Sequence, residues 1–289
     1  MRPRIGLVFS LALLVAVFAV QYPSPSPAAA GDRQAVEVRH TPRRPGAEWA
    51  VAETANFRIF HNETREVAEK AARLVEASRA AACDKWFGES APTWEPRCDV
   101  YLYATAEDYS LATHQPPQVA GHSTIDADGD RVVSRRIDVH CDEPNLFVGV
   151  LPHETTHVVL AGRFGVHRLP HWVDEGMAVV SEPRGRIALH LNNLPRQRRD
   201  GDLYPVGELM RMDQYPDDGR RIGAFYAESV SLVEFLCQYK HKGPRAFARF
   251  LRAGLRDGFE PALEATYGIH DFDELQECWQ RYAFGADAP

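Results

Sequence analysis

Residues 151–160 of the chain read Leu151-Pro152-His153-Glu154-Thr155-Thr156-His157-Val158-Val159-Leu160. Their apolar positions, with an apolar lead from residue 147 and glycines at 162 and 165, predict a helix over about 150–161. Positions i and i+4 lie one above the other on a helix, so His153 and His157 can reach a single ion. Imidazole nitrogen is a favoured zinc ligand, and Glu154 is placed to accept a proton from water at that ion. The stretch therefore predicts a zinc site that carries its own base.

A third ligand is predicted in the next segment, which reads Leu169-Pro170-His171-Trp172-Val173-Asp174-Glu175-Gly176-Met177-Ala178 and begins a second helix over 171–182. A catalytic zinc site has three protein ligands and an open fourth position. Glu175 lies eighteen residues after His157 and can return to the ion from an adjacent antiparallel helix. Small residues at Gly176 and Ala178 allow the two helices to approach closely.

The five-residue pattern is weak when it is taken alone. With the His and Glu fractions of this chain, random order produces it about 4% of the time. A helix whose two histidines are solvated or packed in a core is the simple alternative. Metzincins, another class of zinc enzyme, are excluded, because they need Gly and His at the positions where this chain has Leu160 and Arg163.

Several stretches together resemble the gluzincin metallopeptidases, in particular the bacterial peptidase-MA-like domains of exported proteins. Three carry most of the resemblance: the HExxH helix, the P-x-W-x-x-E-G-x-A segment at 170–178, and the stretch at 225–236. The strand near residue 57 and the closing helix at 274–282 are also similar. The resemblance covers roughly residues 53–284, which is nearly the whole chain after its N-terminal segment.

This resemblance implies a zincin-like fold with one Zn²⁺ ion per chain. The implied metal ligands are His153, His157 and Glu175. The spacer before Glu175 is one residue shorter than in the aminopeptidase-type members, a difference that a loop can absorb.

The resemblance also implies the catalytic residues and the class of substrate. Glu154 is the implied base, and Tyr226 is the implied donor to the oxyanion, with His241 and His270 as alternative donors. The substrate is a peptide or protein that lies extended along an edge strand above the active-site helix, which we expect at Arg131–Val139. No glycine-rich exopeptidase motif precedes the HExxH helix, so we expect an endopeptidase.

Other polar residues near the predicted ligands have open roles. Carboxylates usually orient the histidines that bind zinc, and Asp174, Glu182 and Glu228 are all candidates for this role. We expect His167 and His171 to lie in a loop or helix cap, because a fourth protein ligand would close the site to water.

The wider pattern predicts an α+β fold, in which a small mixed α/β N-terminal half, with an edge strand over the HExxH helix, precedes a mostly helical C-terminal half. Alternating residues predict strands over 56–61, 99–103 and 131–140, with a turn at 126–129 before the last. Helical periodicity predicts four further helices, over 63–85, 224–240, 244–256 and 271–284.

The N-terminal segment reads as a secretory signal peptide over residues 1–30. Two arginines precede an apolar run from 5 to 20, and small residues follow at 28–30. The run is shorter than the roughly 20 residues of a membrane-spanning helix. We therefore expect the protein to be exported, secreted or periplasmic, with tethering to the membrane through an uncleaved N-terminus as the alternative.

The rest of the chain divides simply. Residues 31–52 are rich in Arg, Pro and Gly without a period, which predicts a flexible leader. Residues 53–289 are expected to form a single domain, with halves at about 53–146 and 147–289. Export permits disulfides, and Cys83 with Cys98 or Cys237 with Cys278 are open pairings.

The composition is that of a soluble globular protein, with 45% hydrophobic and 25% charged residues. A net charge of −7 without a dense Lys/Arg block argues against a nucleic-acid partner. The sequence therefore predicts an exported zinc-dependent peptidase. The alternatives are a gluzincin-fold binding or scaffold protein that keeps a structural zinc ion, and a domain without a metal whose HExxH arose by chance.

Overall fold

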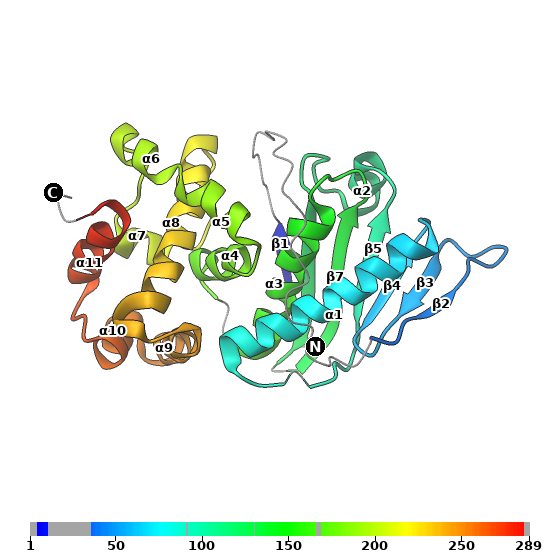
Figure 1. The fold of residues 1–289 in the computed structure, drawn as a ribbon, viewed down its shortest axis with the longest axis horizontal. Coiled ribbons are helices and arrows are strands. Elements are labelled where there is room, and N and C mark those ends of the chain that lie inside the picture. Colours follow the sequence, from blue (N-terminus) through cyan, green and yellow to red (C-terminus); the bar gives the residue numbers. More distant parts are fainter. Residues whose placement is uncertain (1–4, 11–35, 91, 130, 166–168, 286–289) are drawn as a thin grey trace.

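The structure, a computed structural model, describes residues 5–10, 36–90, 92–129, 131–165 and 169–285 (Figure 1). Its strands are β1 (Ile5–Ser10), β2 (Arg39–Thr41), β3 (Ala50–Glu53), β4 (Phe57–His61), β5 (Cys98–Tyr103), β6 (Gly121–Asp128) and β7 (Arg131–His140). Its α-helices are α1 (Arg65–Phe87), α2 (Ala106–Thr113), α3 (Leu151–Phe164), α4 (His171–Val180), α5 (Arg184–Leu191), α6 (Leu194–Asp200), α7 (Val206–Arg211), α8 (Gly219–Gln238), α9 (Pro244–Asp257), α10 (Phe259–Tyr267) and α11 (Phe272–Phe284). A π-helical turn, η1 (Leu146–Val150), precedes α3, and a 3₁₀ turn, η2 (Tyr239–His241), follows α8.

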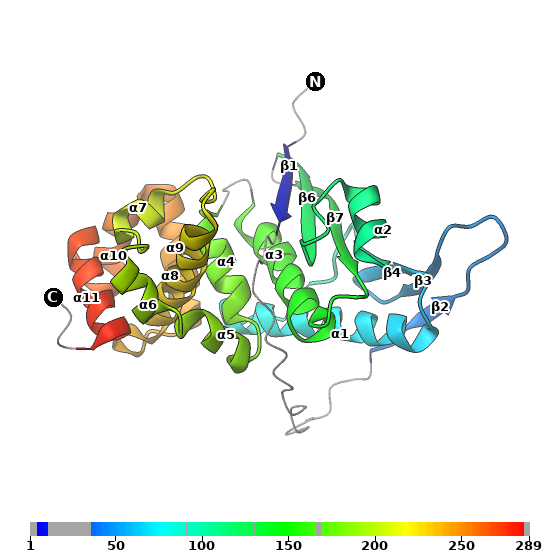
Figure 2. The same cartoon turned by 90° about the horizontal axis from the view of Figure 1, so that it is seen from above.

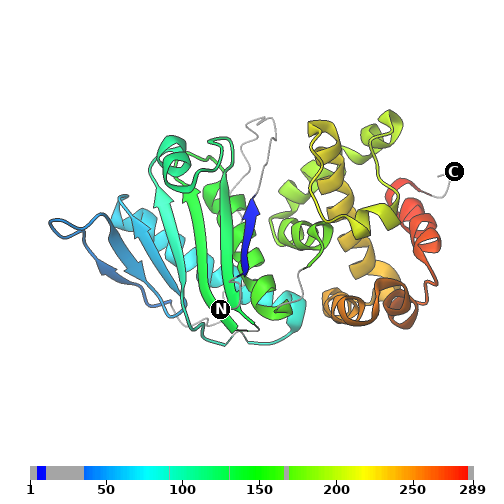
Figure 3. The ribbon, with the colours of Figure 1, turned by 180° about the vertical axis from the view of Figure 1, so that it is seen from behind.

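One mixed sheet occupies the N-terminal half, with the strand order β1-β6-β7-β5-β4-β3-β2. β5 runs parallel to β4 and β7, and the other neighbouring pairs are antiparallel. Helices α1 and α3 cover one face of the sheet (Figure 1 and Figure 3). Alternate strand residues are buried together with these helices and form the core of this half: Phe57, Ile59, Val100, Leu102, Ile137 and Val139.

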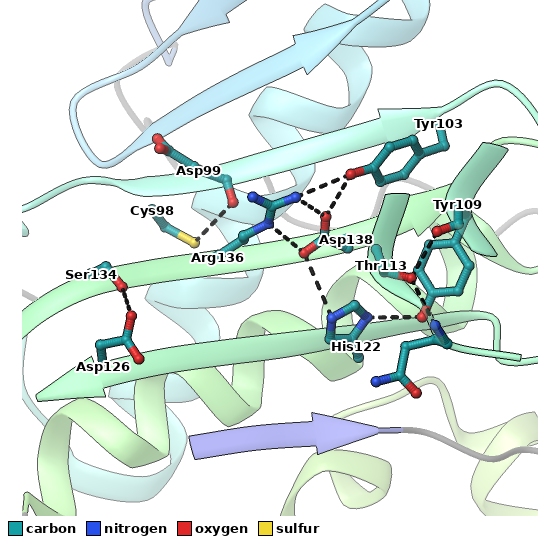
Figure 4. A network of polar contacts seen from close by, with 11 residues as sticks. Cys98, Asp99, Tyr103, Tyr109, Thr113, His122, Asp126, Ser134, Arg136 and Asp138 are labelled. Carbon is teal, nitrogen blue, oxygen red and sulfur yellow. Dashed lines mark hydrogen bonds and ion pairs between the residues drawn. The ribbon is translucent and has the colours of Figure 1, made fainter. Parts of the chain in front are cut away.

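The opposite face of the sheet carries a buried polar network (Figure 4). The Asp138 carboxylate on β7 accepts hydrogen bonds from Arg136 at 2.7 Å and from the Tyr103 hydroxyl at 3.0 Å. His122 on β6 lies 3.7 Å from Asp138, and its Nδ1 lies 2.8 Å from the Tyr109 hydroxyl of α2. A buried carboxylate is unfavourable unless it is paired. The network therefore links β5, β6, β7 and α2 at this end of the sheet.

Helix α8 is the centre of the C-terminal half. It is buried from Ala224 to Leu236 and contacts α4, α5, α6, α9 and α11. Trp279 of α11 donates a hydrogen bond from its indole nitrogen to Ser231 Oγ at 3.0 Å. Helices α6 to α11 gather on one side of the molecule, and α4 and α5 lie between them and the sheet half (Figure 2).

Helix α3 has local signals for both of its ends. The turn η1 leads directly into it, and Pro152 lies in its first turn, where a missing N–H costs no hydrogen bond. The helix ends at Gly165, whose φ of +64° favours glycine. His153, Glu154 and His157 are all buried within it, which requires partners for their polar atoms.

The structure confirms the elements with clear periodicity, which appear as β4, β5, β7, α1, α3, α4, α8, α9 and α11. It differs at the edge of the sheet. The strand expected there, over residues 131–139, is β7, which lies inside the sheet between β5 and β6. Residues 126–128, expected in a turn, belong instead to β6. The Gly, Ser and Asp residues of β6 have low strand propensity, and pairing with β7 overrides it.

The N-terminal region also differs from expectation. Residues 39–41 and 50–52, expected in a flexible leader, form β2 and all but the last residue of β3, and these two strands pair with each other beside β4. Within the predicted signal peptide only residues 5–10 are described, and they form β1 against β6. Its other residues, 1–4 and 11–30, lie outside the described residues.

The cysteines do not form either of the open pairings. All five are free thiols, and Cys83 and Cys98 are buried as such. Among the helices that the structure describes, none combines the length and apolarity that a membrane crossing requires.

The small size of Gly176 lets α4 pack closely on α8, and not on α3 as expected, because this face of α4 is turned toward α8. A Cβ atom there would lie 2.7 Å from the Ser229 carbonyl oxygen and 2.7 Å from Val233 Cγ2. We expect Gly176→Ala to lower the free energy of unfolding by about 1–3 kcal/mol, because an added methyl group strains a packed interface. Urea denaturation measures this change.

Gly162→Ala is the matched control on α3. A Cβ atom at this exposed helical position would meet only Arg135 Nη2, at 4.0 Å. We expect this variant to gain about 0.5–1 kcal/mol of stability, because Ala is the better helix former. Equal effects of the two substitutions would contradict the close packing of α4 on α8.

Candidate metal centre

Two helices bring the three predicted ligands together. His153 and His157 lie one turn apart on α3, and Glu175 lies on α4, which packs against α3. One ligand atom of each lies within 4.8 Å of the others. The two Nε2 atoms are 3.0 Å apart, and Glu175 Oε2 lies 3.4 Å from His153 Nε2 and 3.8 Å from His157 Nε2. All three side chains are buried.

These distances fit a tetrahedral zinc site. Bonds of about 2.0–2.2 Å at tetrahedral angles place neighbouring ligand atoms about 3.3 Å apart, close to the distances above. Glu175 Oε2 is buried and has no hydrogen-bond partner within the described part of the chain. Such an atom needs a partner, which a metal ion would supply. Two imidazoles and one carboxylate are a donor set that suits Zn²⁺ and leaves a fourth position for water.

A carboxylate holds His153 from the other side of its ring. His153 Nδ1 lies 2.9 Å from Glu182 Oε1, and Arg186 Nε donates to Glu182 Oε2 at 2.5 Å. Burial alone would lower the pKa of His153, but the carboxylates of Glu175 and Glu182 raise that pKa to about 10. Because Nδ1 is occupied, Nε2 is the atom directed at the other ligands.

The other two ligands are oriented in the same way. His157 Nδ1 lies 3.0 Å from Asp174 Oδ2, and the Tyr215 hydroxyl donates to Glu175 Oε1 at 2.6 Å. Burial alone would lower the pKa of His157, but the carboxylates of Asp174 and Glu175 raise that pKa. In each of the three residues, one nitrogen or oxygen atom is thus held by a neighbouring side chain, and the other faces the place where the three ligand atoms converge.

Two further buried groups have unpartnered polar atoms among the described residues: both carboxylate oxygens of Glu154 and the hydroxyl of Tyr226. Burial raises the pKa of Glu154, against the lowering effect of His157 and His153. Burial also raises the pKa of Tyr226, and the Glu175 and Glu154 carboxylates add to this rise. A carboxylate with a raised pKa is suited to take and return a proton, and a tyrosine that stays protonated is suited to donate a hydrogen bond.

Of the three carboxylates considered as partners of the histidines, two have this role in the structure and the third does not. Asp174 and Glu182 are the partners of the two histidines, as described above. Glu228 lies elsewhere: its two oxygens accept hydrogen bonds from the Tyr204 backbone N–H, at 3.2 and 3.0 Å. It therefore ties α8 to the segment before α7 rather than to the metal ligands.

The remaining predicted histidines do not join the cluster. His241 and His270, the alternative oxyanion donors, are exposed, and His270 lies 3.3 Å from a carboxylate oxygen of Glu264. His171 is the first residue of α4, and its Nε2 lies 3.1 Å from the Asp213 carbonyl oxygen. His167 lies outside the described residues.

Three residues at the site were not predicted from the sequence. Tyr215, in the loop before α8, holds the ligand Glu175 directly, and Arg186, on α5, holds Glu182, the partner of His153. His190 of α5 has its ring centroid 6.1 Å from that of Tyr226, and burial lowers the pKa of His190 to about 4. Of these three residues, only Arg186 had a signal in the sequence, which is its i, i+4 spacing from Glu182. Tyr215 and His190 reach the site through tertiary folding, which no local pattern indicates.

Comparison with known proteins adds no assignment: no protein-family model matches the chain, and no curated protein shows significant similarity to it. Its function is therefore inferred from the motifs and from the geometry of the site.

Tyr215→Phe tests the outer support of the metal ligands. The substitution removes the hydroxyl that holds Glu175 and keeps the ring, which packs on His171 and Phe225. We expect zinc affinity to fall about 10- to 100-fold, the usual loss when the partner of a ligand is removed. Competition with a chromophoric chelator measures the affinity. The half-exposed Tyr282 on α11 gives the control variant Tyr282→Phe, and equal affinities of the two variants would contradict the role of Tyr215.

Glu228 makes stability depend on pH. Burial raises the pKa of Glu228 to about 8, although the Tyr204 backbone N–H and the Arg221 guanidinium oppose the shift. The folded protein therefore binds this proton more tightly than the unfolded chain does. The resulting stabilisation is complete below the ordinary value of 4.5 and is lost as the pH rises to about 8.

Glu228→Gln carries no such proton. We expect this variant to become more stable relative to the wild type between about pH 5 and about pH 9, by at most about 5 kcal/mol at about 1.4 kcal/mol per pKa unit. Urea denaturation across this range measures the difference. Glu260→Gln, at an exposed position on α10, is the control. A constant difference between Glu228→Gln and the wild type would show that Glu228 does not titrate in this range.

Proposed function

We propose that the protein is an exported zinc-dependent peptidase of the gluzincin type, with a zincin-like fold. One observation carries this proposal: two imidazole nitrogens and one carboxylate oxygen converge within 4.8 Å on the HExxH helix and its neighbour. The buried Glu154 carboxylate, unpartnered among the described residues, lies between the two histidines in sequence and supports catalysis rather than metal storage. A site that only stores a metal needs no such base.

His153, His157 and Glu175 would hold the ion. A zinc ion in such a site makes water a better nucleophile and polarises the carbonyl of the bond to be cleaved. Glu154 takes a proton from the attacking water and returns it to the leaving amine. The Tyr226 hydroxyl donates a hydrogen bond to the oxygen that becomes negatively charged during the attack.

The proposed substrate is an extended peptide that binds along β6. This strand lies next to α3, outside β7, and its outer side accepts an antiparallel partner. Ile5–Ser10 is such a partner, with Ser10 opposite His122 and Ile5 opposite Ala127. Removal of the proposed signal peptide after residue 30 would take β1 away and leave this side of β6 to a substrate. Binding along the middle of a peptide favours endopeptidase activity.

Glu154→Gln tests the proposal. We expect the zinc-loaded variant to cleave fluorescence-quenched casein at least about 100-fold more slowly than the wild type, because the general base is lost. Its zinc content should be unchanged, because Glu154 is not one of the three converging ligands. Glu107→Gln, at an exposed position on α2, is the matched control and should keep both zinc and activity.

Two outcomes would contradict the peptidase function. A wild type that holds zinc but cleaves neither casein nor a mixed peptide library would be a binding or scaffold protein. Equal cleavage by Glu154→Gln and the wild type would show that the cleavage does not arise at this site.

A further inference from the structure

A cavity of about 800 Å³ lies between α1, the η1–α3 junction and the turn from α4 to α5. Its volume is within the range of ligand-binding pockets in proteins. Most of its lining is apolar and includes Leu74, Phe147 and Ile187. Val148, on the same wall, is 49% exposed. Apolar surface is therefore left uncovered at this cavity, and an apolar ligand would bury it.

Charged side chains gather at one part of the lining. They are Lys85, Arg184, Arg186 and Glu182. Arg186 is bonded to Glu182, and Arg184 forms an ion pair with Glu234. These two pairs balance their own charges. Lys85 forms no such pair: its ammonium group lies over the Trp86 ring, 4.8 Å from the centroid, and the Glu234 carboxylate acts on it only from beyond ion-pair distance.

Lys85 is half-buried in the last turn of α1. Its ammonium group can donate three hydrogen bonds, and the structure gives it one, to the Val180 carbonyl oxygen at 2.6 Å. Within the described ranges no carboxylate forms an ion pair with it. A partly desolvated ammonium group beside an apolar cavity gains from an anionic partner.

The cavity is separate from the metal ligands. Glu182 lies between them, because one of its oxygens faces His153 and the other accepts from Arg186. The Arg186 guanidinium packs against Gly149 of η1, where an added Cβ atom would lie 2.7 Å from Nε and would displace the guanidinium. The hydrogen bond to Glu182 therefore orients Arg186 at the wall of the cavity.

We propose that this cavity binds a single-chain carboxylic acid, with its carboxylate at Lys85 and its hydrocarbon chain along the apolar walls. The lining cation that has no carboxylate within ion-pair distance among the described residues, Lys85, matches one negative charge. The mostly apolar lining matches an unbranched alkyl chain, whose burial is favourable. None of the three predicted metal ligands lines this cavity, so binding there can be measured without zinc and without peptidase activity.

Isothermal titration calorimetry of the full chain with decanoate tests the proposal. We expect saturable binding of one decanoate per chain with a dissociation constant below about 1 mM. The uncharged 1-decanol and the cationic decyltrimethylammonium should bind at least about tenfold more weakly, because neither can pair with an ammonium group. No binding of decanoate, or equal binding of the three probes, would overturn the proposal.

Ala81→Trp locates the bound chain. Ala81 lines the cavity from an exposed position on α1, so an indole there fills the cavity and should abolish decanoate binding. Ala80→Trp, at the adjacent exposed position outside the lining, is the matched control and should leave binding unchanged. Circular dichroism checks that both variants fold. Equal binding by the two variants would place decanoate elsewhere and overturn the proposal.

Lys85→Met locates the carboxylate. It keeps most of the apolar stem and removes the charge, so we expect decanoate to bind at least about fivefold more weakly while 1-decanol is unaffected. Lys242→Met, in an exposed loop away from the lining, removes the same charge and should change neither affinity. Equal losses in the two lysine variants would overturn the proposed contact.

Discussion

The buried contact between α3 and α4 is the constraint on which the rest of the structure depends. Asp174, Glu175 and Glu182 come from one short stretch and are buried against His153 and His157. Buried charges are unfavourable unless they are paired. Asp174 and Glu182 pair with the two imidazoles, and Glu175 lies beside both, so the polar pairing fixes where α4 lies on α3. Because α4 also packs on α8, the same contact places the helical half against the sheet half.

The packing around this contact keeps both helices at the required separation. On one side, α3 packs on the apolar face of the sheet through Leu151 and Val158. On the other side, Gly176 lets α8 approach the back of α4. Helix α8 then carries Tyr226 to the site, and the loop before it brings the Tyr215 hydroxyl to Glu175. The ligands are therefore held by rigid helices, and their outer atoms are bonded before any ion arrives.

Part of this arrangement is predictable from the sequence, because some of it is encoded within single elements. The spacing of His153 and His157 determines their common helix face, and periodic apolar residues identify the long helices and central strands. The prediction of Glu175 as the third metal ligand rested on the motif resemblance as well as on its distance from His157 along the chain. Tyr215 was not predictable, since it is separated from Glu175 by 40 residues and no local pattern relates the two. Strand β6 (Gly121–Asp128) was also not predictable from local sequence, because it forms through its pairing with β7.

The central claim is that His153, His157 and Glu175 hold one zinc ion. Elemental mass spectrometry of the purified full chain after equilibration with zinc and removal of the excess tests it most directly. We expect about one zinc ion per chain in the wild type and almost none in a folded His157→Ala variant. A wild type without zinc, or a variant that retains the full amount, would contradict the metal site and every inference about function that rests on it.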